Sequence, residues 1–230
     1  ALAGFFGRIN YDYKGKYLLE ISGRYDGTSR FAEGHRFGFF PSASLGWRIS
    51  EEPWFAPAKD VMNNLKLRAS FGSLGNQKVT NNAWMRKISF DNFAGYSFDG
   101  SAMGRYATIS APNASDLTWE TSTQYNVGID AGMFNDKLTF TAEGFIRDTK
   151  GMLQQGVALP GVYGADSPLM NSADLRTSGY ELSISWRDQF EIAGRPFGYS
   201  VVANLSDNKT IITKYDNPER TFAKDYYEGM

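Results

Sequence analysis

The sequence predicts an all-β protein: an antiparallel transmembrane β-barrel, of which about eight strands are present. Apolar and polar residues alternate with a period of two along most of the 230 residues. Short turns rich in Gly, Asn, Asp and Lys are interspersed with long segments, as in barrels whose hairpins are tight at one end only. The polar positions carry many Ser, Asn, Gln and Gly residues, which suits a water-filled barrel interior.

The alternation is clearest between Leu117 and Met133. Every apolar residue there has an odd number, and the even positions read Thr, Glu, Ser, Gln, Asn, Gly, Asp and Gly. Successive side chains of a strand point to opposite faces, so this segment has one apolar and one polar face. Seven further segments follow the same period: 5–13, 17–26, 39–49, 65–72, 138–150, 180–187 and 197–206. The apolar residues that fall on their polar face are Phe6, Leu18, Phe40, Phe145 and Val202.

The connections between these segments fall into two kinds. Residues 14–16 and 135–137 are tight hairpin turns, which we assign to the periplasmic side. Residues 27–36, 73–116 and 151–176, and the chain after 208, are long and belong to the extracellular side. Residues 50–64 lie on the short-turn side yet are long and apolar, and we expect a small packed plug or a helical turn there.

Composition excludes several function classes. The net charge is −1, with 24 basic and 25 acidic residues spread along the chain, so nucleic acid is not an expected partner. Cysteine is absent and His35 is the single histidine, which removes disulfides, thiolate zinc sites and multi-histidine centres. We expect no cofactor, no metal and no enzyme activity. Mean hydropathy is −0.40, a value that alternating barrels share with soluble proteins.

The apolar face is predicted to contact outer-membrane lipid. Aromatic rings lie near the strand ends, with Leu, Ile, Val and Ala between them, as in the aromatic girdles of membrane barrels: Tyr13, Tyr17, Trp47, Trp119, Tyr180 and Trp186. Two other interpretations stay open. One is a complete eight-stranded barrel with a structural or adhesive role, and the other is a secreted carbohydrate-binding β-sandwich.

Several sequence blocks are similar in order to the SusC/RagA family of TonB-linked outer-membrane transporters. The loop at 24–31 resembles the family's R-x-D-G-S-S-R-F, with Thr28 in place of the first Ser. The other blocks are FGRINY at 6–11, FPSASLGWRISEE at 40–52, LKLRASFG at 65–72, GNQ at 75–77, LTWE at 117–120 and NLSDNK at 204–209.

The resemblance implies TonB-dependent import of oligosaccharides or peptides with a SusD-like surface lipoprotein. It implies a barrel of about 22 strands, closed by an N-terminal plug. Residues 1–230 would then be one part of a single barrel domain, with the plug, the TonB box and the closing strands outside this chain. The expected location is the bacterial outer membrane, crossed many times.

Candidate binding residues lie in the long loops, where rigid scaffolds place their recognition surfaces. Four loop aromatics could stack on sugar rings or pack against the lipoprotein: Trp84, Tyr96, Phe98 and Tyr163. Loop self-packing is the other interpretation of these rings.

Charged residues suggest two further roles. Arg24, Asp26 and Arg30 resemble family positions near the extracellular rim, where ion pairing would organise the loop. Glu143 and Glu181 fall on the polar face of separate strands. Two carboxylates can form a glycosidase pair, but charges are common in a barrel interior and we do not assign them to catalysis.

Overall fold

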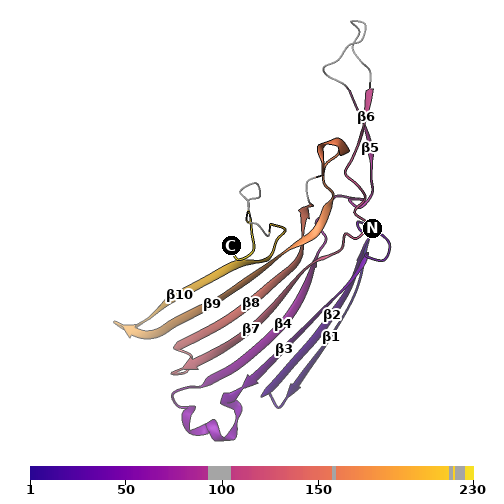
Figure 1. Cartoon of the computed structure of the whole chain (residues 1–230). Coiled ribbons are helices and arrows are strands. Elements are labelled where there is room, and N and C mark those ends of the chain that lie inside the picture. The colour runs from indigo at the N-terminus through magenta and orange to yellow at the C-terminus, as the bar shows by residue number, and fades with distance from the viewer. Residues whose placement is uncertain (93–104, 157–158, 218–219, 221–225) are drawn as a thin grey trace, which may run out of the picture.

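The structure is a computed structural model that describes residues 1–92, 105–156, 159–217, 220 and 226–230. Its main element is one curved, wholly antiparallel sheet in which each strand pairs with its predecessor in the order β1-β2-β3-β4-β7-β8-β9-β10 (Figure 1). The strands are β1 (Leu2–Tyr13), β2 (Tyr17–Thr28), β3 (Phe37–Arg48), β4 (Asn64–Asn76), β7 (Glu120–Met133), β8 (Leu138–Gln155), β9 (Leu169–Ile192) and β10 (Arg195–Lys214). The eight expected strands are confirmed.

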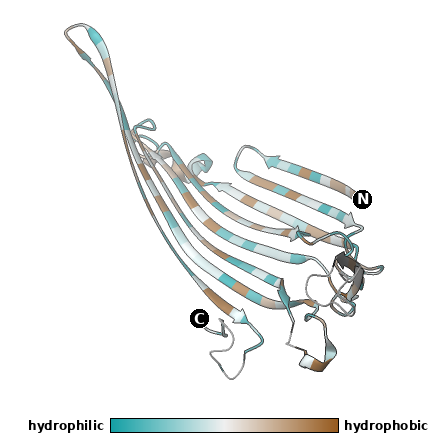
Figure 2. Cartoon of the chain, turned by 90° about the horizontal axis from the view of Figure 1, so that it is seen from above, coloured by the Kyte–Doolittle hydropathy of each residue, from teal (hydrophilic) through white to brown (hydrophobic). Residues whose placement is uncertain are grey.

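The strand register unites the apolar positions of all eight strands on one face. One row across the sheet passes through Ile9, Ile21, Ala43, Phe71, Tyr125 and Ile146. Because directly paired residues share a face, this row fixes the side on which every other residue lies. We call the side of Ile21 the apolar face and the opposite side the polar face. Figure 2 shows the resulting alternation of apolar and polar residues along the strands.

The apolar face is uncovered. Side chains along it stay strongly exposed, with Val127 at 68%, Val201 at 60% and Leu45 at 58%. The accessible surface is 15998 Å². A compact soluble monomer of this mass exposes only ~10,400 Å². The large excess is the surface of an open, single-layered sheet, and no second sheet packs against it among the described residues, so the sandwich interpretation is not supported.

The sheet is also open at its edges. β1 pairs only with β2, and β10 pairs only with β9, within the part of the chain that the structure describes. A closed barrel of eight strands would pair its first strand with its last. The interpretation as a complete small barrel is therefore not supported either.

Three tight hairpins lie at one end of the sheet, which we call the short-turn end. At the first, Lys14 and Gly15 both have positive φ, and the amide of Lys16 donates to the carbonyl of Tyr13 over 3.0 Å. Ala193 and Gly194 repeat the positive φ pair between β9 and β10. Two successive residues of this conformation give the turn whose twist matches that of paired strands.

The connection from β3 to β4 contains the helical turn expected for residues 50–64. It consists of two 3₁₀ helices, η1 (Ile49–Glu51) and η2 (Pro53–Ala58). Phe55 of η2 is buried, whereas Trp54 is 62% exposed. No helix in the described parts of the chain is long and apolar enough to cross a membrane.

The opposite end, which we call the long-loop end, differs from the expectation in extent. β8 continues to Gln155 and β9 begins at Leu169, so much of the segment expected as a loop at 151–176 is strand. Residues 73–116 contain a separate two-stranded hairpin, β5 (Ile88–Asn92) and β6 (Arg105–Ile109), which projects beyond the sheet in Figure 1. A short η3 turn (Gly161–Tyr163) precedes β9.

Candidate functional site

The polar face forms a hydrophilic wall of ion pairs and hydrogen bonds. Arg68 lies at its centre, with Nε 3.2 Å from Oδ2 of Asp130 and Nη1 2.5 Å from Oε2 of Glu143. Arg8 lies 3.6 Å from Glu20 in a looser pair. Positively and negatively charged side chains are thus paired within the polar face, so this face is hydrophilic without a strong net electrostatic potential.

The two carboxylates noted in the sequence meet across one strand pair. Glu143 of β8 lies directly opposite Glu181 of β9 in the register. Like charges at directly opposed positions repel, and the contact between Glu143 and Arg68 offsets this repulsion. The geometry fits a role for Glu143 in holding the wall together.

A chain of hydrogen bonds crosses three strands of the wall. The Nε of Arg147 donates to Gln124 over 2.9 Å, Gln124 donates to Asn126 over 2.7 Å, and Asn126 donates to Ser70 over 3.0 Å. These residues border a hollow of ≈ 560 Å³ in the polar face, which we call the Arg147 hollow. Phe40, Ser42 and Glu20 also line it.

Alternation alone places Gln124 and Asn126 on the polar face, but their link to Arg147 is a tertiary feature. The two residues belong to β7 and Arg147 to β8, and they meet because Gln124 pairs with Arg147 in the register. The registers of several hairpins decide which polar residues become neighbours. The turn expected at 135–137 would pair Phe134 with Leu138 and set Gln124 opposite Asp148. In the structure Met133 pairs with Leu138, which sets Gln124 opposite Arg147, so the sequence prediction of this hairpin is one residue out of register.

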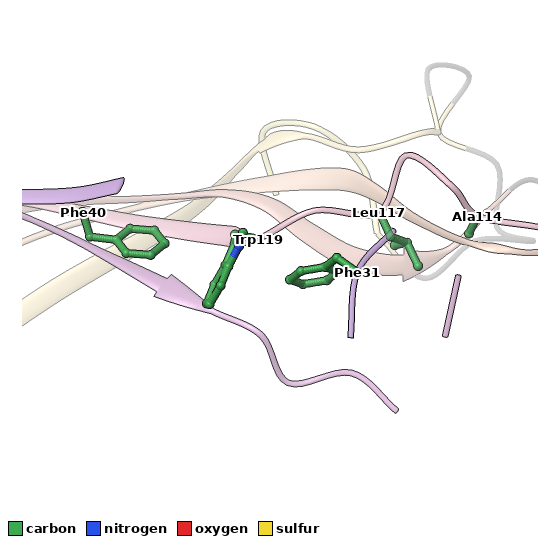
Figure 3. Packing of buried hydrophobic residues seen from close by; sticks show 5 residues of the cluster. All are labelled: Phe31, Phe40, Ala114, Leu117 and Trp119. Atoms are coloured by element: carbon green, nitrogen blue, oxygen red, sulfur yellow. The ribbon is translucent and has the colours of Figure 1, made fainter. Parts of the chain in front are cut away.

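The long-loop end holds the main buried core of the described chain. The cluster joins one residue of β3 to loop residues from two connections: Phe31, Phe40, Ala114, Leu117 and Trp119. The rings follow one another in Figure 3, with Phe40 and Phe31 at 5.3 Å and 5.6 Å from Trp119 between ring centroids. The loops at this end are therefore packed onto the sheet rim by apolar contacts.

The assignment of Trp119 to the lipid-facing girdle was wrong. Its side chain is only 7% exposed, and its Nε1 donates to the carbonyl of Arg36 over 3.2 Å. Leu117 is likewise buried, with 1% of its surface exposed, and β7 begins only at Glu120. The alternation of LTWE mimics a strand, but these side chains pack inward against the loop core because apolar partners are available there.

The three charged residues of the 24–31 block make short contacts near the same end. Arg24 donates through two nitrogens to the carboxylate of Asp26, over 3.1 Å and 3.2 Å. Arg30 donates over 3.1 Å to the carbonyl of Gln77, in the segment that follows β4. Arg30 thereby links the loop between β2 and β3 to the loop that follows β4.

The four candidate aromatics have different surroundings. Trp84 is half-buried and packs against the buried loop cluster, and its carbonyl accepts from the amide of Ala114 over 3.2 Å. Tyr163 ends the η3 turn and is 44% exposed. Tyr96 and Phe98 lie outside the described residues. Neither Trp84 nor Tyr163 lines any of the four hollows found along the strands and the short-turn end.

Aromatic rings form a ladder at the short-turn end of the apolar face. Tyr17 stacks on Tyr13 and on Trp47, each with a centroid distance of 6.4 Å. The carboxylate of Glu52 caps the ladder by accepting from the Tyr17 hydroxyl over 2.7 Å, the Trp47 Nε1 over 3.1 Å and the Lys16 Nζ over 3.2 Å. These hydrogen bonds, that of Tyr17 foremost, lower the pKa of Glu52 below its ordinary value.

No cluster of three or more His, Asp or Glu residues able to hold a metal ion occurs among the described residues. The polar face offers hydrogen-bonding groups and charged side chains.

Comparison with known proteins gives a consistent result. The family model described as "TonB dependent receptor-like, beta-barrel" matches residues 2–228. The TonB-dependent receptor SusC of Bacteroides thetaiotaomicron is 32% identical over 230 residues, covering 98% of this chain and 22% of that protein. TonB-dependent receptor P26 of Formosa agariphila is 33% identical over 213 residues, covering 92% and 20%.

Solved structures of a RagAB peptide importer also match. The "closed-closed" state aligns with a TM-score of 0.78 at 27% identity, covering 93% of this chain and 22% of the matched chain. The "open-open" state aligns with a TM-score of 0.79 at 26% identity, covering 94% and 22%. This chain spans about a fifth of the length of the relatives it matches.

Proposed function

Because this chain belongs to the TonB-dependent receptor-like β-barrel family, we propose that it forms part of the wall of an importer in the bacterial outer membrane. The importer takes up oligosaccharides or peptides. The observation that carries the proposal is the two-sided sheet, with an uncovered apolar face and a hydrogen-bonded polar face. A membrane barrel has the same two faces, since its apolar side chains contact lipid and its polar ones line a water-filled interior.

Membership of this family suggests what surrounds the sheet in the complete importer. Residues 1–230 are one part of a single transmembrane barrel of about 22 strands, which surrounds a plug outside this chain. Energy for import comes from TonB acting on that plug, and a SusD-like lipoprotein covers the external opening. The similarity to SusC and to the RagAB peptide importer supports these partners and the absence of enzyme activity.

Turn lengths orient the sheet in the membrane. We assign the short-turn end to the periplasm and the long-loop end to the exterior, since membrane barrels have short periplasmic turns and long external loops. The aromatic ladder of Tyr13, Tyr17 and Trp47 then lies at the inner interface, where amphipathic rings are favoured.

The external loops form the entrance for cargo. The contacts of Arg24 with Asp26, and of Arg30 with Gln77, support a loop-organising role for the three charged residues. Packing against the buried cluster favours an anchoring role for Trp84. Tyr163, exposed at 44%, remains the better candidate for contact with cargo or with the lipoprotein, and Tyr96 and Phe98 stay proposals from the sequence.

Uptake by whole cells tests the proposal. Cells that express the complete transporter are offered fluorescently labelled oligosaccharides and peptides, with and without a protonophore that collapses the inner-membrane proton gradient. We expect the transporter to be recovered with outer-membrane lipid on flotation and at least one cargo class to enter only while the gradient is intact. Uptake of every cargo that is unaffected by the protonophore, or recovery of the protein in the soluble fraction, would contradict it.

A further inference from the structure

We infer that the Arg147 hollow is a subsite that binds a carboxylate group of the cargo, as carried by an acidic peptide or a uronic-acid oligosaccharide. This inference rests on the proposed import function and extends it to a substrate class. Three observations support it. The guanidinium group of Arg147 has no carboxylate partner in the described part of the chain, it is fixed by neighbouring side chains, and it lies near the long-loop end of the polar face.

The guanidinium of Arg147 lacks a carboxylate partner. No acidic side chain lies within 4.0 Å of it among the described residues, whereas Arg8, Arg24 and Arg68 on the same face each have one. The adjacent acidic residue, Asp148, points to the other face and binds Arg176 over 2.6 Å. An arginine without an anion keeps donors free in the planar, forked arrangement that matches a carboxylate.

The group is also held in place before any ligand arrives. Its Nε is occupied by Gln124, which is fixed in turn by Asn126. The ring of Phe145, two residues earlier on the same face, lies 6.0 Å from the guanidinium carbon. These contacts leave the terminal nitrogens for a ligand, and orienting a side chain in advance lowers the entropy cost of binding.

The position of the hollow suits a passing cargo. Phe40 forms part of both the hollow and the buried loop cluster, so the hollow lies just inside the long-loop end of the wall. Ser42, Ser70 and Asn126 line it with neutral hydrogen-bonding groups. Two charged side chains also line it, and each already has a partner of opposite charge: Glu20 pairs with Arg8, and Arg24 pairs with Asp26. A peptide or a sugar chain offers the many polar groups that such a lining can bind, while the carboxylate engages Arg147.

Binding to the purified, complete transporter tests the inference with two matched pairs of probes. The first pair is a pentapeptide with a free C-terminal carboxylate and the same peptide amidated. The second is trigalacturonate and maltotriose. We expect the wild-type protein to prefer the carboxylate member of at least one pair, and that pair identifies whether peptide or glycan is the source.

Arg147→Gln should weaken binding of the preferred carboxylate probe by ~10- to 100-fold, the range for a charged hydrogen bond, and leave its neutral partner unchanged. Arg187→Gln is the matched control. It removes the same charge from the polar face outside the hollow, and should change neither affinity. Arg147→Lys keeps the charge but not the fork, so an intermediate loss is expected, and this variant serves if Arg147→Gln does not fold.

Two results would overturn the inference. One is the lack of any carboxylate preference in the wild-type protein. The other is an equal loss of charged and neutral probes in both Arg147 variants, which would assign Arg147 a purely structural role. Gradient-dependent uptake of a neutral probe alongside either result would leave the import function standing. Failure of all gradient-dependent uptake would instead contradict the import function.

Discussion

Ile184 and Ser183 are adjacent in β9 and offer a direct comparison of the two faces. Ile184 lies on the apolar face between Phe140 and Ala203, and it is 45% exposed. Ser183 lies on the polar face between Thr141 and Asn204. Changing each residue separately to Arg puts the same charge at nearly the same height on opposite sides of the sheet.

The two substitutions should lower the free energy of unfolding by different amounts, because one side chain faces lipid and the other faces water. Ile184 lies between Trp186 and Tyr180, two aromatic residues of the apolar face, and so within the lipid-covered band. An arginine on the lipid face near the membrane centre costs roughly 2–4 kcal/mol, which lowers the folding equilibrium constant ~30- to 800-fold. Ser183→Arg projects into the water-filled interior among small polar side chains, and should cost about 0.5 kcal/mol or less.

The assay is a denaturant titration of the complete transporter refolded into phospholipid vesicles. Folded protein is quantified by its altered gel mobility before heating. Ile184→Arg should shift the midpoint strongly, and Ser183→Arg should leave it near the wild-type value. Equal shifts for the two variants, or the larger shift for Ser183→Arg, would refute the assignment of faces.

Three more predictions use other contacts. Trp119→Ala should lower the free energy of unfolding by roughly 3–5 kcal/mol, because the residue is only 7% exposed. Trp54 is 62% exposed, so Trp54→Ala should change the free energy of unfolding by no more than about 0.5 kcal/mol in the same titration. The pKa of Glu52 is lowered by folding, so its carboxylate stabilises the protein above its ordinary pKa of 4.5, and this stabilisation is lost as the pH falls through the lowered value. The Tm advantage of wild type over Glu52→Gln should therefore shrink on acidification below pH 4.5, and an advantage independent of pH would contradict this. Arg176→Ala breaks an exposed pair with Asp148 and should cost below roughly 1 kcal/mol; a larger shift in the vesicle titration would show that the pair is shielded from solvent.

The strands and their faces could be predicted from the sequence because alternation has a direct geometric cause. Apolar and polar residues alternate with a period of two where one face of a strand contacts apolar groups and the other face contacts polar groups or water. Even the exception at Phe145 is confirmed, since it pairs with Asn126 on the polar face. Turn chemistry located the first hairpin, where Gly15 provides a positive φ at little cost. It placed the turn between β7 and β8 one residue short, since Met133 and not Phe134 pairs with Leu138.

The loop end could not be predicted in the same way. LTWE at 117–120 continues the alternation of β7, yet Trp119 turns into the cluster with Phe31 and Phe40. That burial depends on a loop 88 residues earlier in the chain, which local periodicity does not report. The β5 and β6 hairpin was missed because its strands are only 5 residues each. The Arg147 hydrogen-bond chain likewise depends on residues from three strands.

Alternate side chains of this sheet are proposed to contact lipid while their neighbours face water, and spin labels can measure both environments. The chain contains no cysteine, so single cysteines at each of positions 180–187 can carry a spin label in the complete transporter in bilayers, once any cysteine outside this chain has been replaced by serine. We expect the accessibility of the label to oxygen, which concentrates in lipid, to peak at the even positions, and its accessibility to a water-soluble nickel complex to peak at the odd ones. Profiles without this alternation, or with the two sets exchanged, would contradict it.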